Sequence, residues 1–331
     1  MPGFGAVTLL CLSSATATSA LAKEPFDFLP LPEQAKPVAE PAEGYRLQRV
    51  GTNGFVVISG VVQANFFVTK TGVVVVDAPP VLTDKLVKAI KSVTDKPVTH
   101  VILTHDHADH AGGASAFPGA KIVAHALTAE LMRVYPDPKR PIPTLTFSGA
   151  RYDLKVGGTH FQLIYPGPNH ETGNIIVYIP EQRIAMMTDL FAPGWAPYLG
   201  WGNADHIPGL LKSYDTLLSL DFDVFLAGHA YRIGNRHDVE VSRAFFLDLW
   251  NWTKETIAAT PFDPSKAEPG NLWLAQSIWF KEIADKVTPR LIAKWGNELA
   301  AVDAFTHSTV MAVVVSTFTD APSIPDSNLK P

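Results

Sequence analysis

The chain has 331 residues, of which 47% are hydrophobic and 18% are charged, and its formal net charge is −5. This length is sufficient for one large domain, or for a domain with a substantial appendage, built around a sizeable core. The acidic balance does not indicate a basic face for nucleic acid or for an anionic membrane surface. We therefore expect a small-molecule substrate, no nucleic-acid partner and no membrane association of the mature chain.

Residues 1–22 have the pattern of a secretory signal peptide. An apolar stretch from Ala6 to Leu12 is followed by a small-x-small sequence that ends at Ala22. The segment has no Lys or Arg near its start, so a disordered or partly buried apolar N-terminus is the competing interpretation. The only cysteine, Cys11, lies in this segment, and its removal would leave no thiol for a disulfide, a metal or nucleophilic catalysis. We expect a secreted or periplasmic protein.

The next segments change from a linker to a run of strands. Residues 23–44 are rich in Pro, Ala, Lys and Glu without a clear period, which predicts an extended linker. Residues 45–77 contain β-branched and aromatic runs separated by Gly and Asn, which predict a meander of strands. The most apolar run ends at Asp77, which we expect either to hydrogen-bond to neighbouring loops or to be an ordinary turn residue.

Helices and strands then alternate, as in a sheet covered by helices. The pattern predicts helices at 83–93, after Gly113 and at 127–134, and strands at 98–103 and 121–124. Residues 135–149 contain four prolines and predict a long irregular connection of the kind that is often functional. Further strands are expected at 152–154, 161–165, 174–179, 183–187 and 224–229.

Histidines and aspartates recur where predicted strands end. Four of them follow the apolar run 101–103 within six positions, and Gly112-Gly113 then allows a tight turn; three more follow later strands. The seven are His105, His107, Asp109, His110, His170, Asp189 and His229. Imidazole and carboxylate suit zinc and neighbouring transition metals. Seven ligands are too many for one tetrahedral ion, but they suit two ions about 3.5–4 Å apart with a bridging carboxylate.

These segments and their order resemble the metallo-β-lactamase-fold superfamily over roughly residues 45–235. The resemblance implies an α+β fold, a four-layer αβ/βα sandwich with the metal site at one edge between the two sheets. It implies that His105, His107 and His170 hold a first ion and that Asp109, His110 and His229 hold a second. It also implies that Asp189 bridges the ions, as in glyoxalase II and metallo-lactonases and unlike lactamases with a cysteine there, and that Asp77 is the structural aspartate of the first motif.

The function that this resemblance implies is hydrolysis by a dinuclear metal centre. We expect two Zn²⁺ per chain, although His and Asp ligation also suits manganese or iron. A metal-bound hydroxide would open a small lactam or lactone, with Asp109 as the catalytic residue that orients the nucleophile and moves its proton. The alternatives are a glyoxalase II-like thioesterase and an iron-dependent oxidoreductase. The acidic balance disfavours RNA hydrolysis, and the filled ligand positions disfavour a degenerate binding protein.

The loop after Asp189 and the C-terminal region remain to be assigned. The loop is aromatic and rich in Gly and Pro, which suits a wall against a flat or apolar molecule. Its candidate substrate-binding residues are Phe191, Trp195, Tyr198 and Trp201. Residues 239–331 predict a helical extension to a catalytic domain at 45–238; the extension serves core or dimer packing, and a lid is the alternative. The six other histidines (His100, His125, His160, His206, His237 and His307) have no motif around them and are expected to be structural or exposed.

Overall fold

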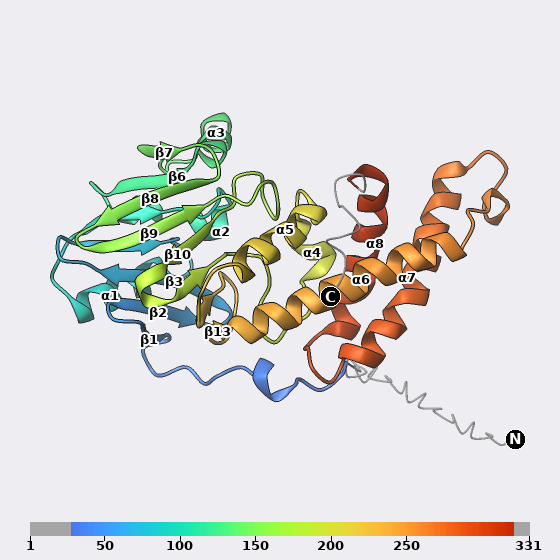
Figure 1. Ribbon diagram of the computed structural model, residues 1–331, viewed down its shortest axis with the longest axis horizontal. Coiled ribbons are helices and arrows are strands. Elements are labelled where there is room, and N and C mark those ends of the chain that lie inside the picture. The colour runs from blue at the N-terminus through green and yellow to red at the C-terminus, as the bar shows by residue number, and fades with distance from the viewer. Residues whose placement is uncertain (1–27, 321–331) are drawn as a thin grey trace, which may run out of the picture.

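A computed structural model describes residues 28–320, so the predicted signal peptide lies outside the described residues. Two β-sheets face each other, helices cover their outer faces, and a group of long helices extends from one end (Figure 1). This confirms the predicted four-layer αβ/βα sandwich with a C-terminal helical extension.

The first sheet has seven strands, which follow one another in chain order from β1 to β7. Strands β1 to β4 form the predicted antiparallel meander, and β4 to β7 are parallel. The strands are β1 (Arg46–Val50), β2 (Gly54–Ser59), β3 (Val62–Val68), β4 (Val73–Val76), β5 (Val98–Ile102), β6 (Lys121–His125) and β7 (Leu145–Phe147). Helices α1 (Thr83–Val93) and α3 (Ala126–Val134) make crossovers in the parallel part, and the short α2 (Ala108–Ala111) follows β5.

The second sheet has six strands in the order β13-β12-β11-β10-β9-β8. Only the β11–β12 pair is parallel, and α5 (Ile207–Leu218) lies in the connection between these two strands. The strands are β8 (Arg151–Val156), β9 (Thr159–Ile164), β10 (Ile176–Ile179), β11 (Ile184–Met186), β12 (Val224–Leu226) and β13 (Gly234–Asn235).

Alternation along the strands fills two cores at once. In β4, Val74 and Val76 belong to the core between the sheets, whereas Val73 and Val75 pack on the opposite face, which α1 covers. All four are fully buried, because a strand buried on both faces presents successive side chains to opposite cores. Burial on both faces fixes the register of the central strands. The C-terminal ends of strands from both sheets therefore lie at one edge of the sandwich.

The helical extension comprises α6 (Arg236–Ala259), α7 (Leu272–Trp295) and α8 (Val302–Thr319). One apolar cluster runs from Phe225 of β12 and Tyr214 of α5 into Trp250, Leu291 and Val310 of the three helices. Helix α6 therefore packs against β12 and β13 of the second sheet, and α7 and α8 pack against α6 beyond the end of the sandwich (Figure 1). No helix within residues 28–320 is both long and apolar enough to cross a membrane.

Two local predictions were wrong. The helix expected after Gly113 is only a 3-10 turn, η2 (Ala114–Ala116), because Pro118 lacks an N–H and disfavours a helical conformation in Phe117. The connection at 135–149 is not wholly irregular, since β7 pairs in parallel with β6. In the predicted linker, the described residues include the 3-10 turn η1 (Glu33–Ala35), whose Ala35 is fully buried.

Candidate metal centre

The structure brings all seven predicted ligands together at one edge of the sandwich. They follow β5, β9, β11 and β12, strands that lie in two different sheets. Two groups form, each with ligand atoms within 4.8 Å of one another. The first consists of His105, His107, His170 and Asp189, and the second of Asp109, His110, Asp189 and His229.

Asp189 is the residue common to both groups. Its Oδ2 lies 3.1 Å from Nε2 of His110 and 3.3 Å from Nε2 of His170. The same oxygen is 3.6 Å from Nε2 of His105, and Oδ1 is 3.6 Å from Nε2 of His229. One carboxylate therefore faces imidazoles of both groups, which is the arrangement that a bridging ligand requires.

The imidazoles are placed as a metal would need them. Nδ1 of His107 lies 3.1 Å from Nε2 of His170, and Nε2 of His110 lies 3.0 Å from Nε2 of His229. The buried Nε2 of His105 has no hydrogen-bond partner. Ring nitrogens that converge in a buried place, one of them unsatisfied, fit a cation that accepts their lone pairs. This nitrogen and oxygen donor set suits zinc, manganese or iron.

The electrostatics distinguish His105 and His107 of the first group from His110 of the second. Burial, with the neighbouring His110, holds the pKa of His105 well below its usual value, and burial, with His170, lowers the pKa of His107. Burial also opposes protonation of His110, but the carboxylate of Asp189 outweighs it and raises the pKa of His110 to about 9. Without a metal, His105 and His107 are therefore neutral imidazoles, whereas His110 in the second group carries a proton.

Asp77 organises the centre without being a ligand. It accepts hydrogen bonds from the N–H of Thr104 at 2.9 Å, from the hydroxyl of Thr104 at 2.8 Å and from the hydroxyl of Thr188 at 2.8 Å. The Thr104 hydroxyl also lies 3.0 Å from Nδ1 of His105, which turns Nε2 of that ring towards the other ligands. The prediction that Asp77 hydrogen-bonds to loops near the cluster is confirmed.

Thr104 and Thr188 were not singled out from the sequence. The available signal is their position, since each directly precedes a ligand at the end of a buried strand. Asp77 and Asp189 themselves have φ of 56° and 61°, in the left-handed region that non-glycine residues seldom adopt. Such conformations concentrate at functional sites, where the surroundings hold them.

The four predicted pocket residues lie in different environments. Phe191 and Trp201 are 6% and 2% exposed and belong to the apolar core, where Phe191 stacks on Phe225 and Trp201 packs edge-on against Phe246. Their rings therefore anchor the loop in the apolar core. Trp195 is half-buried, and Tyr198 is 63% exposed, so these two rings reach the surface.

The same loop makes a left-handed turn beside the first ligand group. Residues 200–203 all have φ between 58° and 63°, in and around the short α4 (Leu199–Asn203). A Cβ on Gly202 would lie 3.6 Å from Cε1 of His170, so this turn borders a ligand directly.

The helical extension holds this loop in place. The N–H of Gly200 donates to the hydroxyl of Ser308 on α8 at 3.1 Å, and Tyr198 packs edge-on against Phe305 of the same helix. The N–H of Ala300 donates to the carbonyl of Gly194 at 2.9 Å. The position of the loop next to the ligands therefore depends on α8 and on the turn that precedes it.

The six other histidines lie outside both ligand groups found among the described residues. His206 accepts from the N–H of Gly209 and caps α5, and His125 stacks on Tyr165. His160 pairs with Asp153 at 2.7 Å on the surface. The contacts of these three histidines are structural, as expected for histidines outside the ligand set.

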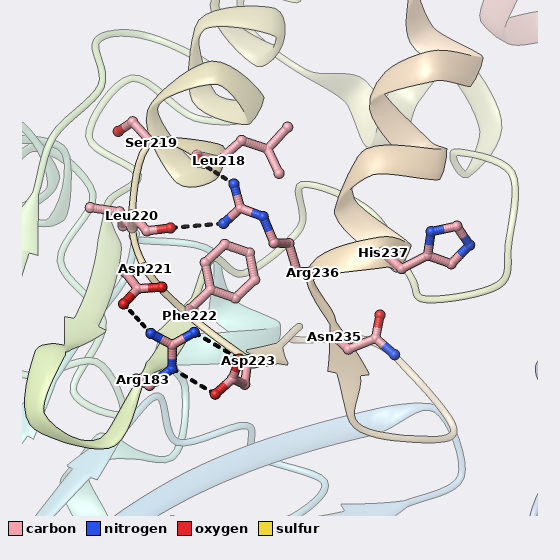
Figure 2. Close-up of a pocket in the computed structure, with 10 residues that line it drawn as sticks. All are labelled: Arg183, Leu218, Ser219, Leu220, Asp221, Phe222, Asp223, Asn235, Arg236 and His237. Atoms are coloured by element: carbon pink, nitrogen blue, oxygen red, sulfur yellow. Dashed lines mark hydrogen bonds and ion pairs between the residues drawn. The ribbon is translucent and has the colours of Figure 1, made fainter.

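A surface hollow of about 470 Å³ lies beside the N-terminal ends of β11 and β12, opposite the ends that carry the ligands. Its Arg183 and Asp223 precede β11 and β12, whereas Asp189 and His229 follow the same two strands. Figure 2 shows the Arg183 guanidinium between Asp221 and Asp223, with Nε of Arg183 2.6 Å from Asp223 Oδ2. Arg183 is therefore paired with two carboxylates on the surface, away from the ligand groups.

Comparison with known proteins agrees with this fold. The sequence-family model that describes the metallo-beta-lactamase superfamily matches residues 58–229, which is more than half of the chain. The chain therefore belongs to this superfamily. Among similar proteins, the alpha subunit of a 2,4-dinitroanisole O-demethylase from Nocardioides sp. (strain JS1661) is 34% identical over 249 residues, which cover 72% of this chain and 70% of that one. A type 2 metallo-beta-lactamase from Bacillus sp. (strain 170) is 38% identical over 122 residues, but these cover only 35% of this chain and 45% of the lactamase.

Solved structures show the same fold. The metallo-beta-lactamase IND-7 superposes with a TM-score of 0.54 at 23% identity, over 62% of this chain and 99% of that one. A metallo-beta-lactamase from Pontibacter korlensis superposes with a TM-score of 0.53 at 22% identity, over 61% of this chain and 98% of that one.

Proposed function

We propose that this chain is a dinuclear metal-dependent hydrolase that opens a small cyclic amide or ester. The observation that carries this proposal is the sharing of Asp189 by two groups of converging ligands. Membership of the metallo-beta-lactamase superfamily supports it. His105, His107 and His170 would hold one ion, Asp109, His110 and His229 the other, and Asp189 would contact both.

Two divalent ions held in this way make water a stronger nucleophile at neutral pH and polarise a carbonyl. The side chain of Asp109 is mostly exposed, and its Oδ2 lies 3.4 Å from Nε2 of His229. This hydrogen bond lowers the pKa of Asp109, which keeps the carboxylate ionised near neutral pH. Asp109 can therefore take the proton of the attacking water and return it to the leaving nitrogen or oxygen. Ring opening then adds one water across the acyl bond.

Trp195 and Tyr198 support a flat or apolar substrate. Both belong to the loop that follows Asp189, and both rings reach the surface. We propose that they contact the part of the substrate that does not react, because aromatic side chains commonly line small-molecule pockets.

A second candidate is hydrolytic cleavage of an aryl methyl ether. The relative named as an O-demethylase subunit is similar over 72% of this chain, far more than the 35% covered by the Bacillus lactamase. Hydrolysis of 2,4-dinitroanisole would add water across the ether and release methanol and 2,4-dinitrophenol. An oxidative demethylation would instead consume oxygen and release formaldehyde.

One set of assays separates these reactions. The purified chain is analysed for metals and incubated in H₂¹⁸O, with and without oxygen, with β-lactams, γ-lactones, a glutathione thioester and 2,4-dinitroanisole. Ring opening with ¹⁸O in the new carboxylate, independent of oxygen, supports the first proposal. Methanol and dinitrophenol support the second, and thioester cleavage alone would favour the glyoxalase II-like alternative. Iron with oxygen consumption would contradict hydrolysis, and Asp189→Ala serves as the inactive control.

We also propose that the chain is exported and that it forms a homodimer through its helical extension. The pattern of residues 1–22 supports export, and the N-terminal sequence of the mature protein tests it. Trp273 on α7 is 84% exposed, with Leu272 exposed beside it and Phe318 exposed on α8, as at a contact surface. Light scattering tests dimerisation, which Trp273→Glu should weaken.

A further inference from the structure

The proline-rich segment 135–144 contacts both ends of the loop that carries four of the ligands. At one end, Nη1 of Arg140 donates to the carbonyl oxygen of Asp106, which lies between His105 and His107. At the other end, the carbonyl of Lys139 accepts from the N–H of Ser115 at 3.3 Å. Neighbouring residues of one segment thus hold the loop at two points, one between His105 and His107 and one after the last of the four ligands.

The segment is itself held in a defined turn. The N–H of Arg140 donates to the carbonyl of Asp137 at 2.9 Å, and the N–H of Lys139 donates to Oδ1 of Asp137 at 2.9 Å. Pro138 fixes φ within this turn, and Pro136, Pro141 and Pro143 fix it on either side. The backbone that carries Arg140 is therefore restricted before the guanidinium makes any contact.

The guanidinium lies in a place that is largely closed to solvent. The side chain of Arg140 is 13% exposed, and its Nη1 lies 3.5 Å from Oδ2 of Asp106. Its Nη2 donates to the carbonyl of Tyr135 at 3.3 Å, and Nε lies 3.6 Å from Oδ2 of Asp137. Nη1 of Arg140 therefore contacts the carbonyl and the carboxylate of Asp106 in the ligand loop, whereas Nη2 and Nε face residues of its own segment.

The contact with Asp106 bears on the metal ligands because of where that carbonyl lies. The peptide between Asp106 and His107 sets the direction from which the His107 imidazole approaches His170, whose Nε2 is 3.1 Å away. Partners that orient metal ligands from outside the ligand set influence metal affinity.

We propose that Arg140 is a positioning residue for the metal centre: it fixes the carbonyl of Asp106 so that His105 and His107 converge on one ion. This inference rests on the proposed function, because it requires the first ligand group to bind metal. A lysine cannot reproduce the arrangement in full, since one ammonium cannot reach both carbonyls as the two separated nitrogens of a guanidinium do.

The test measures Zn²⁺ affinity in a chain that binds one ion. His229→Ala removes a ligand of the second group only, and a coloured chelator then reports the Zn²⁺ affinity of the first group by competition. Adding Arg140→Ala should weaken this affinity about 10- to 100-fold, as is usual when such outer partners are lost. Arg140→Lys should recover part of it.

Arg183→Ala in the same background is the matched control. It removes a guanidinium that is also bound to acidic side chains (Figure 2), but Arg183 precedes β11, whereas Asp189 follows this strand. It should leave Zn²⁺ affinity unchanged. Thermal unfolding of each metal-free variant, followed by circular dichroism, shows whether the folded fraction is equal.

The outcomes separate this inference from the proposed function. Equal Zn²⁺ affinity with and without Arg140→Ala would contradict the positioning role and leave the metal centre intact. If the unaltered chain bound none of Zn²⁺, Mn²⁺ and Fe²⁺, the result would contradict the metal centre and, with it, this inference. If Arg140→Ala does not fold, Arg140→Lys decides: a loss of affinity in a folded variant supports the role, and full affinity contradicts it.

Discussion

The carboxylate of Asp77 and the hydroxyl of Thr188 lie 2.8 Å apart, although 111 residues separate them in the chain. Asp77 follows β4 of the first sheet, and Thr188 follows β11 of the second and precedes Asp189. The same carboxylate binds Thr104, the residue before His105. One buried non-ligand thus links the two sheets at the point where their ligands meet.

Replacement of Asp77 by Ala should lower the free energy of unfolding by several kcal/mol. It leaves two hydroxyls and one N–H without their acceptor, and each buried donor left unpaired costs about 1–3 kcal/mol. Urea unfolding of the metal-free protein measures the loss. Asp77→Asn keeps one carbonyl oxygen and should cost less. Equal stability of Asp77→Ala and the unaltered chain would show that these hydrogen bonds contribute little.

Metal binding should release a proton from His110 at neutral pH. The pKa of His110 is raised to about 9, so its imidazole is protonated at pH 7 and must lose that proton before it can bind a metal. Above about pH 10 the ring is already neutral, and this release should disappear. Titration calorimetry in buffers of different ionisation enthalpy counts the protons released. The same proton release at pH 7.5 and above pH 10 would contradict the raised pKa.

Gly202→Ala should change substrate binding more than metal binding. Its φ of 63° strains any side chain, at a cost of about 1–2 kcal/mol, and the new methyl group would contact the His170 ring without a clash. We expect a raised KM with two ions retained. Gly119→Ala is the control, because Gly119 also has a positive φ, of 84°, but has open space around its Cβ position. A change in KM in both variants would point to general destabilisation.

Loss of the Ser308 hydroxyl should loosen the loop next to the ligands. Ser308→Ala removes the acceptor of the Gly200 N–H, so we expect KM to rise several-fold while metal content stays the same. Thr317→Ala, further along α8, removes a hydroxyl that donates to the carbonyl of Val314 in the same helix, and it should leave KM unchanged. Steady-state kinetics on both variants test whether the extension acts on the loop. Identical KM values would contradict this.

Much of the fold and the ligand set could be predicted because strand ends carry a local signal. The apolar run before His105 and the later strands that end at His170, Asp189 and His229 can each be recognised from the sequence, and strand alternation explains why β4 is buried on both faces. The helical spacing of Val241, Phe245 and Leu249 likewise indicated α6, although that helix begins at Arg236.

Contacts between distant segments could not be predicted in the same way. The sequence around Arg140 shows a proline-rich stretch but not its partner Asp106, 34 residues earlier. The aromatic loop predicted a pocket wall, yet the burial of Phe191 and Trp201 depends on Phe225 and Phe246, which come from other elements. Such pairings are decided by tertiary packing, which leaves no periodic pattern in the sequence.

The metal content of three purified proteins tests most directly whether Asp189 joins two ions. Because Asp189 is the ligand common to both groups and His229 belongs to one, we predict two zinc ions per unaltered chain and one in His229→Ala. Asp189→Ala should bind neither ion tightly and should show no hydrolysis. Two ions retained by Asp189→Ala, or fewer than two in the unaltered chain at saturating zinc, would contradict a dinuclear centre bridged by this carboxylate.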